Sequence, residues 1–260
     1  MTQIDAEQAK RVTRQHAEAS RLQGVDFIAV GMPASKEESA PVGPPAVQVE
    51  LKPPPPGRDR AASQRKLDNV LAWYLKDAPH KSFNSTFQNI VFGEGDPCAR
   101  LMFVGEAPGA DEDESGRPFV GRAGQLLDRI IAAMGLRREE VYIANVLKTR
   151  PPNNATPTPN EAALCAPYLH AQIDAVSPEA LVTLGVPATH LLLNSTEAMA
   201  RLRGRWWTFT TPSGKEIPVM PTYHPAYLLR QYTDDNRKKV WSDMQMVMTR
   251  LGIAGTSNKA

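Results

Sequence analysis

Four short apolar segments, separated by stretches with helical periodicity, constrain the fold of this chain most. The apolar segments lie at 100–104, 141–145, 180–184 and 217–221. Helical patterns occupy 122–134, 160–176, 186–193 and about 235 to 250. Strands that alternate with helices are typical of βαβ units, in which helices cover both faces of a parallel sheet. We therefore predict an α/β fold.

The first apolar segment ends in the turn Gly105-Glu106-Ala107-Pro108-Gly109. Its glycines and proline favour a tight turn and allow a ligand to approach the backbone closely. In an open α/β sheet, ligands bind at the carboxyl ends of the strands. The Glu106 carboxylate could therefore position water, stabilise positive charge or bond a substrate amide. We interpret most of the acidic residues at 111–114 as a solvated loop.

An aromatic ring follows in the phrase Arg117-Pro118-Phe119-Val120-Gly121. A phenylalanine after a proline is normally a core residue. Beside a ligand site the same ring could instead stack on a flat base, and such stacking contributes about 1–3 kcal/mol. Both interpretations of Phe119 stay open at this point.

Two later strand ends also carry polar side chains. The strand at 141–145 ends at Asn145, whose amide offers a pyrimidine edge both a donor and an acceptor, although it could equally be a satisfied turn residue. His224 follows the strand at 217–221, and its imidazole could donate a hydrogen bond to developing negative charge. We expect Glu106, Asn145 and His224 to meet in one cleft.

Basic residues accompany these strand ends. Lys148 and Arg150 belong to a loop that contains two prolines, and Arg230 and Arg237 follow His224. An ordinary solvated loop would explain the first pair. Contact with phosphates would explain all four, and such contacts position a nucleic acid without reading its sequence.

The beginning of the chain has a different composition from the rest. Residues 33–56 hold eight prolines, which cannot continue a helix or pair in the centre of a sheet. We expect residues 1–62 to form a disordered, Pro-rich extension, with a docking site for a partner as the alternative.

Order is expected to begin near Ser63. Apolar residues at 67, 70, 71, 74 and 75 have helical spacing, and residues 90–92 predict a short strand. The ordered domain should then span 63–252, and 253–260 should form a flexible tail.

Composition excludes several classes of protein. A net charge of +2 is too small to indicate nucleic-acid binding by itself. Two cysteines, Cys98 and Cys165, cannot form a disulfide framework or a four-cysteine metal site. No apolar run approaches the length of a transmembrane helix, and the first residues lack the apolar core of a signal peptide. We expect a soluble cytoplasmic monomer without a membrane partner.

Several phrases of this sequence, in order and at matching spacing, closely resemble the family 4 uracil-DNA glycosylases. The resemblance runs from about Val91 to about Leu251. It rests on the phrases Val91-Phe92-Gly93-Glu94-Gly95, Met102-Phe103-Val104-Gly105-Glu106-Ala107-Pro108-Gly109, Pro118-Phe119-Val120-Gly121, Ala123-Gly124-Gln125-Leu126-Leu127, Tyr142-Ile143-Ala144-Asn145-Val146, Arg150-Pro151-Pro152 and His224-Pro225-Ala226-Tyr227-Leu228-Leu229-Arg230.

The resemblance implies a three-layer α/β/α fold with a central four-stranded parallel sheet. It also implies an enzyme that hydrolyses the N-glycosidic bond of deoxyuridine in DNA and thereby starts base-excision repair. Such enzymes extrude the target base from the duplex at a cost of a few kcal/mol. Uracil-containing DNA would be the partner.

Roles for individual residues follow from the same resemblance. Phe119 would stack on uracil, Asn145 would read its polar edge, and His224 would hydrogen-bond a uracil oxygen as negative charge builds on the leaving base. Glu106 would position the attacking water or stabilise the cationic sugar.

Gly105 and Ala107 would complete the base-binding pocket. Ala107 stands where the related family 1 enzymes carry a catalytic aspartate, which places more weight on stabilising the leaving group. With DNA as the substrate, the phosphate contacts considered above for Lys148, Arg150 and Arg230 would be contacts to the DNA backbone.

One feature departs from the family. Its members usually hold a four-iron, four-sulfur cluster on four cysteines, and the corresponding positions here are Ala78, Lys81, Thr149 and Cys165. Cluster ligation needs about four thiolates, so we expect no iron–sulfur cluster and no other metal or cofactor. Either local packing replaces a structural cluster, or the chain has been repurposed; the retained polar residues favour the first explanation.

The predicted function is therefore uracil-DNA glycosylase. The alternative is a non-catalytic DNA-binding or partner-recruiting protein built on a glycosylase fold. A covalent trap for DNA, as in a related group with a histidine in an inserted basic loop, is disfavoured because no such insertion follows Gly121. Preference for single- or double-stranded DNA, and acceptance of other damaged bases, stay open.

Overall fold

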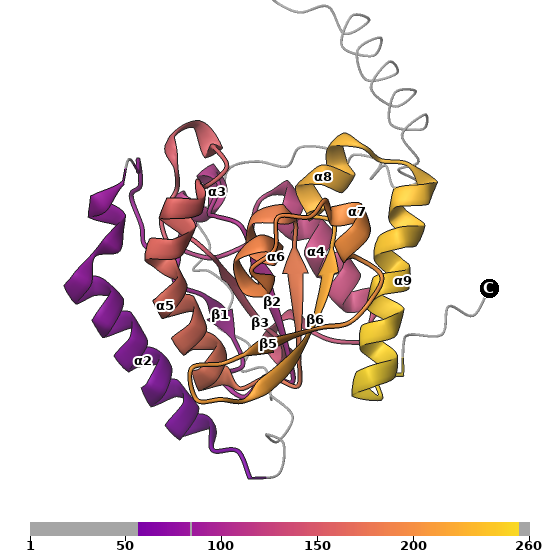
Figure 1. Cartoon of the computed structure of the whole chain (residues 1–260), viewed down its shortest axis with the longest axis horizontal. Helices are drawn as coiled ribbons and strands as arrows, with labels where there is room; N and C mark the ends of the chain where they lie inside the picture. The colour runs from indigo at the N-terminus through magenta and orange to yellow at the C-terminus, as the bar shows by residue number, and fades with distance from the viewer. Residues whose placement is uncertain (1–56, 84, 255–260) are drawn as a thin grey trace, which may run out of the picture. The chain divides into compact units, whose positions relative to one another are not determined.

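The computed structural model describes residues 57–83 and 85–254 (Figure 1). Residues 1–56 and 255–260 lie outside this part, so most of the predicted extension at 1–62 and of the tail at 253–260 is not described. The first helix, α2, begins at Arg60, three residues before the predicted start of the domain. Asp59 caps it by accepting a hydrogen bond from the Ala61 amide at 2.9 Å.

A six-stranded sheet forms the centre of the described region. Its spatial order is β1-β3-β2-β4-β6-β5, in which β3, β2, β4 and β6 run parallel and the two edge strands run antiparallel. The strands are β1 (Glu94–Gly95), β2 (Leu101–Gly105), β3 (Tyr142–Asn145), β4 (Ala180–Leu184), β5 (Trp207–Thr210) and β6 (Glu216–Thr222).

The predicted four-stranded parallel sheet is confirmed as the centre of a larger, mixed sheet. Strand β5 was not predicted, because as an edge strand it exposes alternate residues and carries no continuous apolar run. The strand predicted at 90–92 is wrong: Val91 donates one backbone hydrogen bond to Lys148 at 2.8 Å, and the short strand lies at β1 instead.

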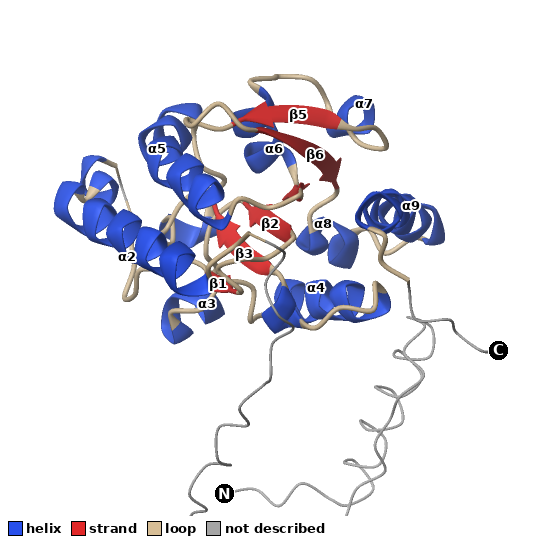
Figure 2. Cartoon of the chain, turned by 90° about the horizontal axis from the view of Figure 1, so that it is seen from below, coloured by secondary structure: helices blue, strands red, loops and turns tan. Residues whose placement is uncertain are grey.

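Helices cover both faces of the sheet, as Figures 1 and 2 show. They are α2 (Arg60–Asp77), α3 (Ala110–Ser115), α4 (Arg122–Ala133), α5 (Pro159–Val176), α6 (Val186–Leu193), α7 (Met199–Leu202), α8 (Pro225–Arg230) and α9 (Asp234–Leu251). None of the helices in the described residues is both long and apolar enough to cross a bilayer.

Alternate residues of each of the four parallel strands pack into two separate cores. Met102 and Val104 of β2 pack with residues of α5 and α6, whereas Leu101 and Phe103 pack with residues of α4 and α9. This alternation follows from strand geometry, since successive side chains point to opposite faces. The three-layer α/β/α architecture is therefore confirmed, with α2 lying outside α5 (Figure 1).

The topology brings three distant segments to one edge of the sheet. Strands β2, β3 and β6 are parallel and end at Gly105, Asn145 and Thr222. Because the carboxyl ends of parallel strands share an edge, the loops that follow them converge there.

Candidate active site

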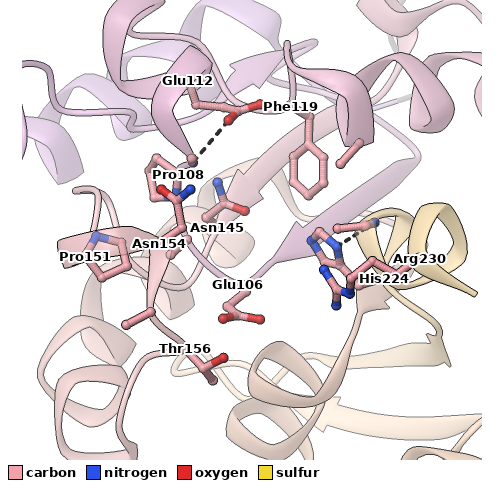
Figure 3. Close-up of a pocket in the computed structure, with 15 residues that line it drawn as sticks. Glu106, Pro108, Glu112, Phe119, Asn145, Pro151, Asn154, Thr156, His224 and Arg230 are labelled. Atoms are coloured by element: carbon pink, nitrogen blue, oxygen red, sulfur yellow. Dashed lines mark hydrogen bonds between the residues drawn. The ribbon is translucent and has the colours of Figure 1, made fainter.

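A cavity of about 330 Å³ lies at this edge of the sheet (Figure 3). The Glu106, Asn145 and His224 side chains point into the same space, with the Phe119 ring beside them. The predicted convergence of these segments is thus present. The cavity is lined by Glu106, Ala107, Pro108, Gly109, Glu112, Phe119, Ala123, Asn145, Pro151, Asn154, Ala155, Thr156, His224, Ala226 and Arg230.

Asn145 presents an unused hydrogen-bond acceptor. Its side chain is buried, with 1% of the residue exposed, and its Oδ1 atom has no hydrogen-bond partner. A buried amide oxygen without a partner is costly. Because Asn145 lines the cavity, a ligand donor placed there would remove that cost.

Gly105 lies behind this amide and has no side chain. A Cβ atom built on Gly105 would lie 2.4 Å from Asn145 Oδ1 and 2.4 Å from Phe119 Cζ. Only glycine therefore lets the amide and the ring approach the end of β2 together. Gly105 does not itself line the cavity, whereas the predicted neighbour Ala107 does.

Phe119 is held in a conformation that its neighbours impose. It is buried, and its φ of 52° falls in the left-handed region that non-glycine residues rarely occupy. A Cβ atom on Gly124 would lie 1.9 Å from the Phe119 carbonyl oxygen, so the first turn of α4 packs directly against this backbone. The ring lies 5.6 Å from the His224 ring, between centroids.

Glu112 joins the two loops that flank the cavity. One carboxylate oxygen accepts hydrogen bonds from the amides of Val120 (2.8 Å) and Gly121 (2.9 Å), and the other accepts from Gly109 (3.1 Å). Asp113 is also buried and accepts from the Gln88 amide at 2.8 Å. The interpretation of 111–114 as a mainly solvated loop is therefore wrong for Glu112 and Asp113.

His224 caps the short helix α8 with one nitrogen and keeps the other free. Its Nδ1 accepts a hydrogen bond from the Ala226 amide at 3.0 Å. An imidazole nitrogen that accepts cannot carry the proton, so the hydrogen of the neutral ring is on Nε2. Burial and the charge of Arg230 lower the pKa of His224 to about 4, which keeps the ring neutral near pH 7.

Glu106 lines the cavity and is partly buried. Burial raises the pKa of Glu106, while the Thr156 hydroxyl and the positive charge of Arg230 act in the opposite direction. Thr156 was not identified from the sequence, because a threonine in a loop between two prolines carries no pattern that marks a site. Its position becomes clear only in the folded chain, where Thr156 lines the same cavity as Glu106 (Figure 3).

The four residues considered as phosphate contacts occupy different environments. Arg237 is exposed and pairs with Asp234 at 3.2 Å. Arg230 is exposed and lines the cavity, and Arg150 bonds Asn154 Oδ1 at 2.8 Å in an exposed position. Lys148 is 0% exposed, and its amine bonds the Asn145 carbonyl at 2.7 Å. A buried amine cannot reach a DNA phosphate, which corrects the prediction for Lys148.

The positions that the resemblance assigns to the cluster ligands do not fit an iron–sulfur cluster. Of Ala78, Lys81, Thr149 and Cys165, one carries a thiol, and the buried Thr149 hydroxyl has no hydrogen-bond partner. The other cysteine, Cys98, lies 3.5 Å from the Ser63 hydroxyl of α2. Within the described ranges, no group of three or more His, Cys, Asp and Glu side chains is arranged to hold a metal ion.

The cavity thus offers a flat ring, a neutral hydrogen-bond donor, an unpaired amide oxygen and a carboxylate. These groups suit a planar heterocycle that presents an acceptor and a donor. They also suit a reaction that builds negative charge on that ring and needs water.

Comparison with known proteins agrees with this chemistry. The profile of the Uracil DNA glycosylase superfamily matches residues 92–245. The chain is 46% identical over 184 residues to the Type-4 uracil-DNA glycosylase of Thermotoga maritima. The matched region covers 70% of this chain and 94% of that protein.

Two further relatives extend the comparison. Identity is 43% over 168 residues with the Type-4 uracil-DNA glycosylase of Archaeoglobus fulgidus (63% of this chain, 83% of that protein). It is 35% over 149 residues with the Type-5 uracil-DNA glycosylase of Pyrobaculum aerophilum (52% and 64%). The family profile covers more than half of the chain, and the chain belongs to the uracil-DNA glycosylase superfamily.

Proposed function

We propose that this chain is a uracil-DNA glycosylase, which releases uracil from DNA and so starts base-excision repair. The observation that carries the proposal is the meeting of the neutral His224 donor and the unpaired Asn145 oxygen beside the Phe119 ring. Uracil offers an acceptor to the first, a donor to the second and a flat face to the third. Identity to Type-4 uracil-DNA glycosylases supports the same substrate.

The reaction places the charge where these residues can act on it. The bond between sugar C1′ and base N1 breaks, and its electron pair leaves with uracil while the sugar becomes cationic. Water then bonds C1′ and loses a proton, and the uracil anion gains one, so that neutral uracil and an abasic sugar result. His224 Nε2–H would donate to the uracil oxygen that gains negative charge, as oriented donors do at developing oxyanions.

Glu106 would act on the opposite, cationic side of the reaction. Its carboxylate would hold the attacking water or stabilise the positive sugar, and a pKa raised by burial makes it a better proton acceptor. Gly105, Ala107, Phe119 and Asn145 would bind the base.

Arg150 and Arg230 would contact the DNA backbone near the cavity. Arg230 carries its charge at the cavity rim, where the phosphate next to an extruded nucleotide would lie.

We also propose that the chain folds without an iron–sulfur cluster. One thiol among the four corresponding positions supports this, because about four thiolates are needed. Purified protein should contain no stoichiometric iron and show no iron–sulfur absorbance band. Stoichiometric iron together with that band would contradict the proposal.

The residues before Gly57 are proposed to be dispensable for uracil release. A chain that began at Ser63, the predicted start of order, would lose the bond from Arg58 to the Cys98 carbonyl (3.3 Å) and the ion pair of Arg60 with Asp96 (2.8 Å). A truncated chain starting at Gly57 should release uracil at the full-length rate. We further propose that the protein acts in the cytoplasm as a monomer. Its molar mass, measured by light scattering during gel filtration, tests the oligomeric state.

The activity is tested with an oligonucleotide that contains one deoxyuridine and a matched one that contains thymidine. Strand breaks after alkali in the first alone indicate an abasic product and support the proposal. A retarded band without breaks indicates the alternative, a non-catalytic DNA-binding protein. A heat-stable adduct indicates covalent trapping, and either of these outcomes overturns the proposed hydrolysis.

A further inference from the structure

A fully buried lysine, Lys148, bonds the main chain of the cavity residue Asn145 and has no part in the chemistry described so far. Lys148 Nζ donates a hydrogen bond to the main-chain oxygen of Asn145 at 2.7 Å and another to the side-chain oxygen of Gln172. The Phe92 ring lies 5.6 Å from the same nitrogen. Burying an ammonium group is costly unless it is paired, and no carboxylate pairs with Lys148 within residues 57–83 and 85–254. A buried lysine without a carboxylate partner is unusual, so its hydrogen bonds should indicate its role.

Gln172 fixes the direction of this contact. It is fully buried on α5, and its Nε2 donates to the Phe92 carbonyl at 2.9 Å. Its Oε1 is therefore the atom left for Lys148. The lysine thus connects α5 to the end of β3.

The Asn145 carbonyl needs a partner that the sheet does not supply. The next amide, Val146, donates to Gly105 of β2 at 3.0 Å. In a trans peptide the preceding carbonyl points the opposite way, so the Asn145 oxygen faces away from β2. On that side β1 pairs only with Tyr142 and Ile143, and the Lys148 amine fills the missing place.

We infer that Lys148 is a positioning residue, which anchors the main chain of Asn145 so that its side-chain amide stays aimed at the base in the cavity. The inference rests on the proposed uracil-DNA glycosylase activity and names a residue through which Asn145 acts. Lys148 itself does not line the cavity.

The protonation state of Lys148 is compatible with this role. Burial lowers its pKa to about 7. Both the ammonium and the neutral amine carry at least two N–H hydrogens, which is enough for the Asn145 and Gln172 oxygens.

The test is a double-mutant cycle with Lys148→Met and Asn145→Ala, using single-turnover uracil release. Lys148→Met should slow release about tenfold in the wild-type background, within the range of coupling between contacting residues. It should cause no further loss in the Asn145→Ala background. Equal losses in both backgrounds would mean that Lys148 only supports the fold, and no loss in the wild-type background would also overturn the inference.

Tyr168→Phe is the matched control. It removes a hydrogen bond from the Tyr168 hydroxyl to Asp77, at 2.8 Å, which also joins α5 to a neighbouring segment but does not reach Asn145. Its release rate should equal that of the wild type. If Lys148→Met does not fold, Gln172→Leu replaces it in the cycle, with a smaller loss that must again vanish in the Asn145→Ala background.

A binding measurement separates this inference from the proposed function. DNA that contains 2′-fluoro-2′-deoxyuridine resists hydrolysis, and its affinity relative to thymidine DNA reports base reading alone. If the wild type releases no uracil, the proposed activity fails, yet the same cycle in this affinity ratio still decides the role of Lys148. A ratio unchanged by Lys148→Met in a folded protein would overturn it.

Discussion

The cavity and the contact between α2 and α5 are both built from rings and polar side chains, but their polar atoms are used differently. At the cavity, Asn145 Oδ1 has no partner and His224 uses only Nδ1. At the contact between α2 and α5, the Tyr168 hydroxyl of α5 donates to Asp77 of α2 at 2.8 Å. Beside it, the Tyr74 hydroxyl of α2 bonds Nδ1 of His80, which lies just after the end of α2, at 3.0 Å.

This difference separates a binding role from a folding role. Polar atoms left open at a cavity are available to a ligand, whereas bonded polar atoms stabilise the fold. The Tyr74 and Tyr168 rings meet edge to face at 5.2 Å, which adds to that closed contact. Changes at the cavity should therefore alter the reaction, and changes between the helices should alter stability.

The largest expected effect is that of His224→Ala. Loss of the Nε2–H donor should slow single-turnover uracil release about 10²–10³-fold, as for one oriented donor at a developing oxyanion. Tyr74→Phe, from the closed contact, should release uracil at the wild-type rate. Near-normal release by His224→Ala would contradict the role of His224 as the donor to the leaving uracil.

Gly105→Ala should have the next largest effect. The new methyl group would displace the Asn145 amide or the Phe119 ring, each 2.4 Å away, and a misplacement near 1 Å can slow a reaction about 10²-fold. Overpacking should also lower the free energy of unfolding by about 1–3 kcal/mol.

Gly214→Ala is the control for that variant. Gly214 has a φ of 85° and nothing within 4 Å of a built Cβ, so alanine there strains the backbone without touching the cavity. It should lose stability in a melting experiment and keep the release rate. Equal rate losses in both variants would show that Gly105 acts only through stability.

The parallel sheet and the converging strand ends could be predicted because their cause is local. Strands buried on both faces give continuous apolar runs, such as Leu101–Val104, and parallel strands end at the same edge. Glu106, Asn145 and His224 were found by their place after such runs. Pairing of β5 gave no comparable signal, since half of that strand is exposed.

The roles of charged residues could not be predicted in the same way. Lysine is usually a surface residue. Lys148 is buried with its amine bonded to the side chain of Gln172, which lies 24 positions later in the sequence. Glu112 belongs to an acidic run typical of a solvated loop, but it joins Gly109 to Val120 and Gly121. Both outcomes depend on contacts that form only after the loops fold.

The pH dependence of the reaction should reveal a neutral His224. The His224 pKa is lowered to about 4, so the neutral donor persists until the pH falls through that value. Glu106, whose pKa is raised, should protonate first and set the acid limb of the wild type. The residual release of Glu106→Gln should then stay level from about pH 8 to about pH 5, below the ordinary histidine pKa.

The opposite slope would contradict this mechanism. Release by Glu106→Gln that rises as the pH falls through about 6.5 would mean that the imidazolium is the active form. The stability that comes from keeping His224 neutral is present above its unfolded pKa of 6.5 and is lost as the pH falls toward 4. His80, whose pKa is also lowered by burial, should contribute to the same loss.

The smallest effect is expected for Tyr74→Phe, and it tests the other half of the comparison. The change removes the hydroxyl that bonds His80 at 3.0 Å and keeps the ring. Unfolding free energy should fall by about 1 kcal/mol, which lowers the melting temperature by roughly 2–4 °C for a domain of this size. Because no atom of this contact lines the cavity, uracil release by the folded fraction should not change. A loss of release without a loss of stability would mean that the Tyr74–His80 contact reaches the site, and that contact could no longer be assigned to folding alone.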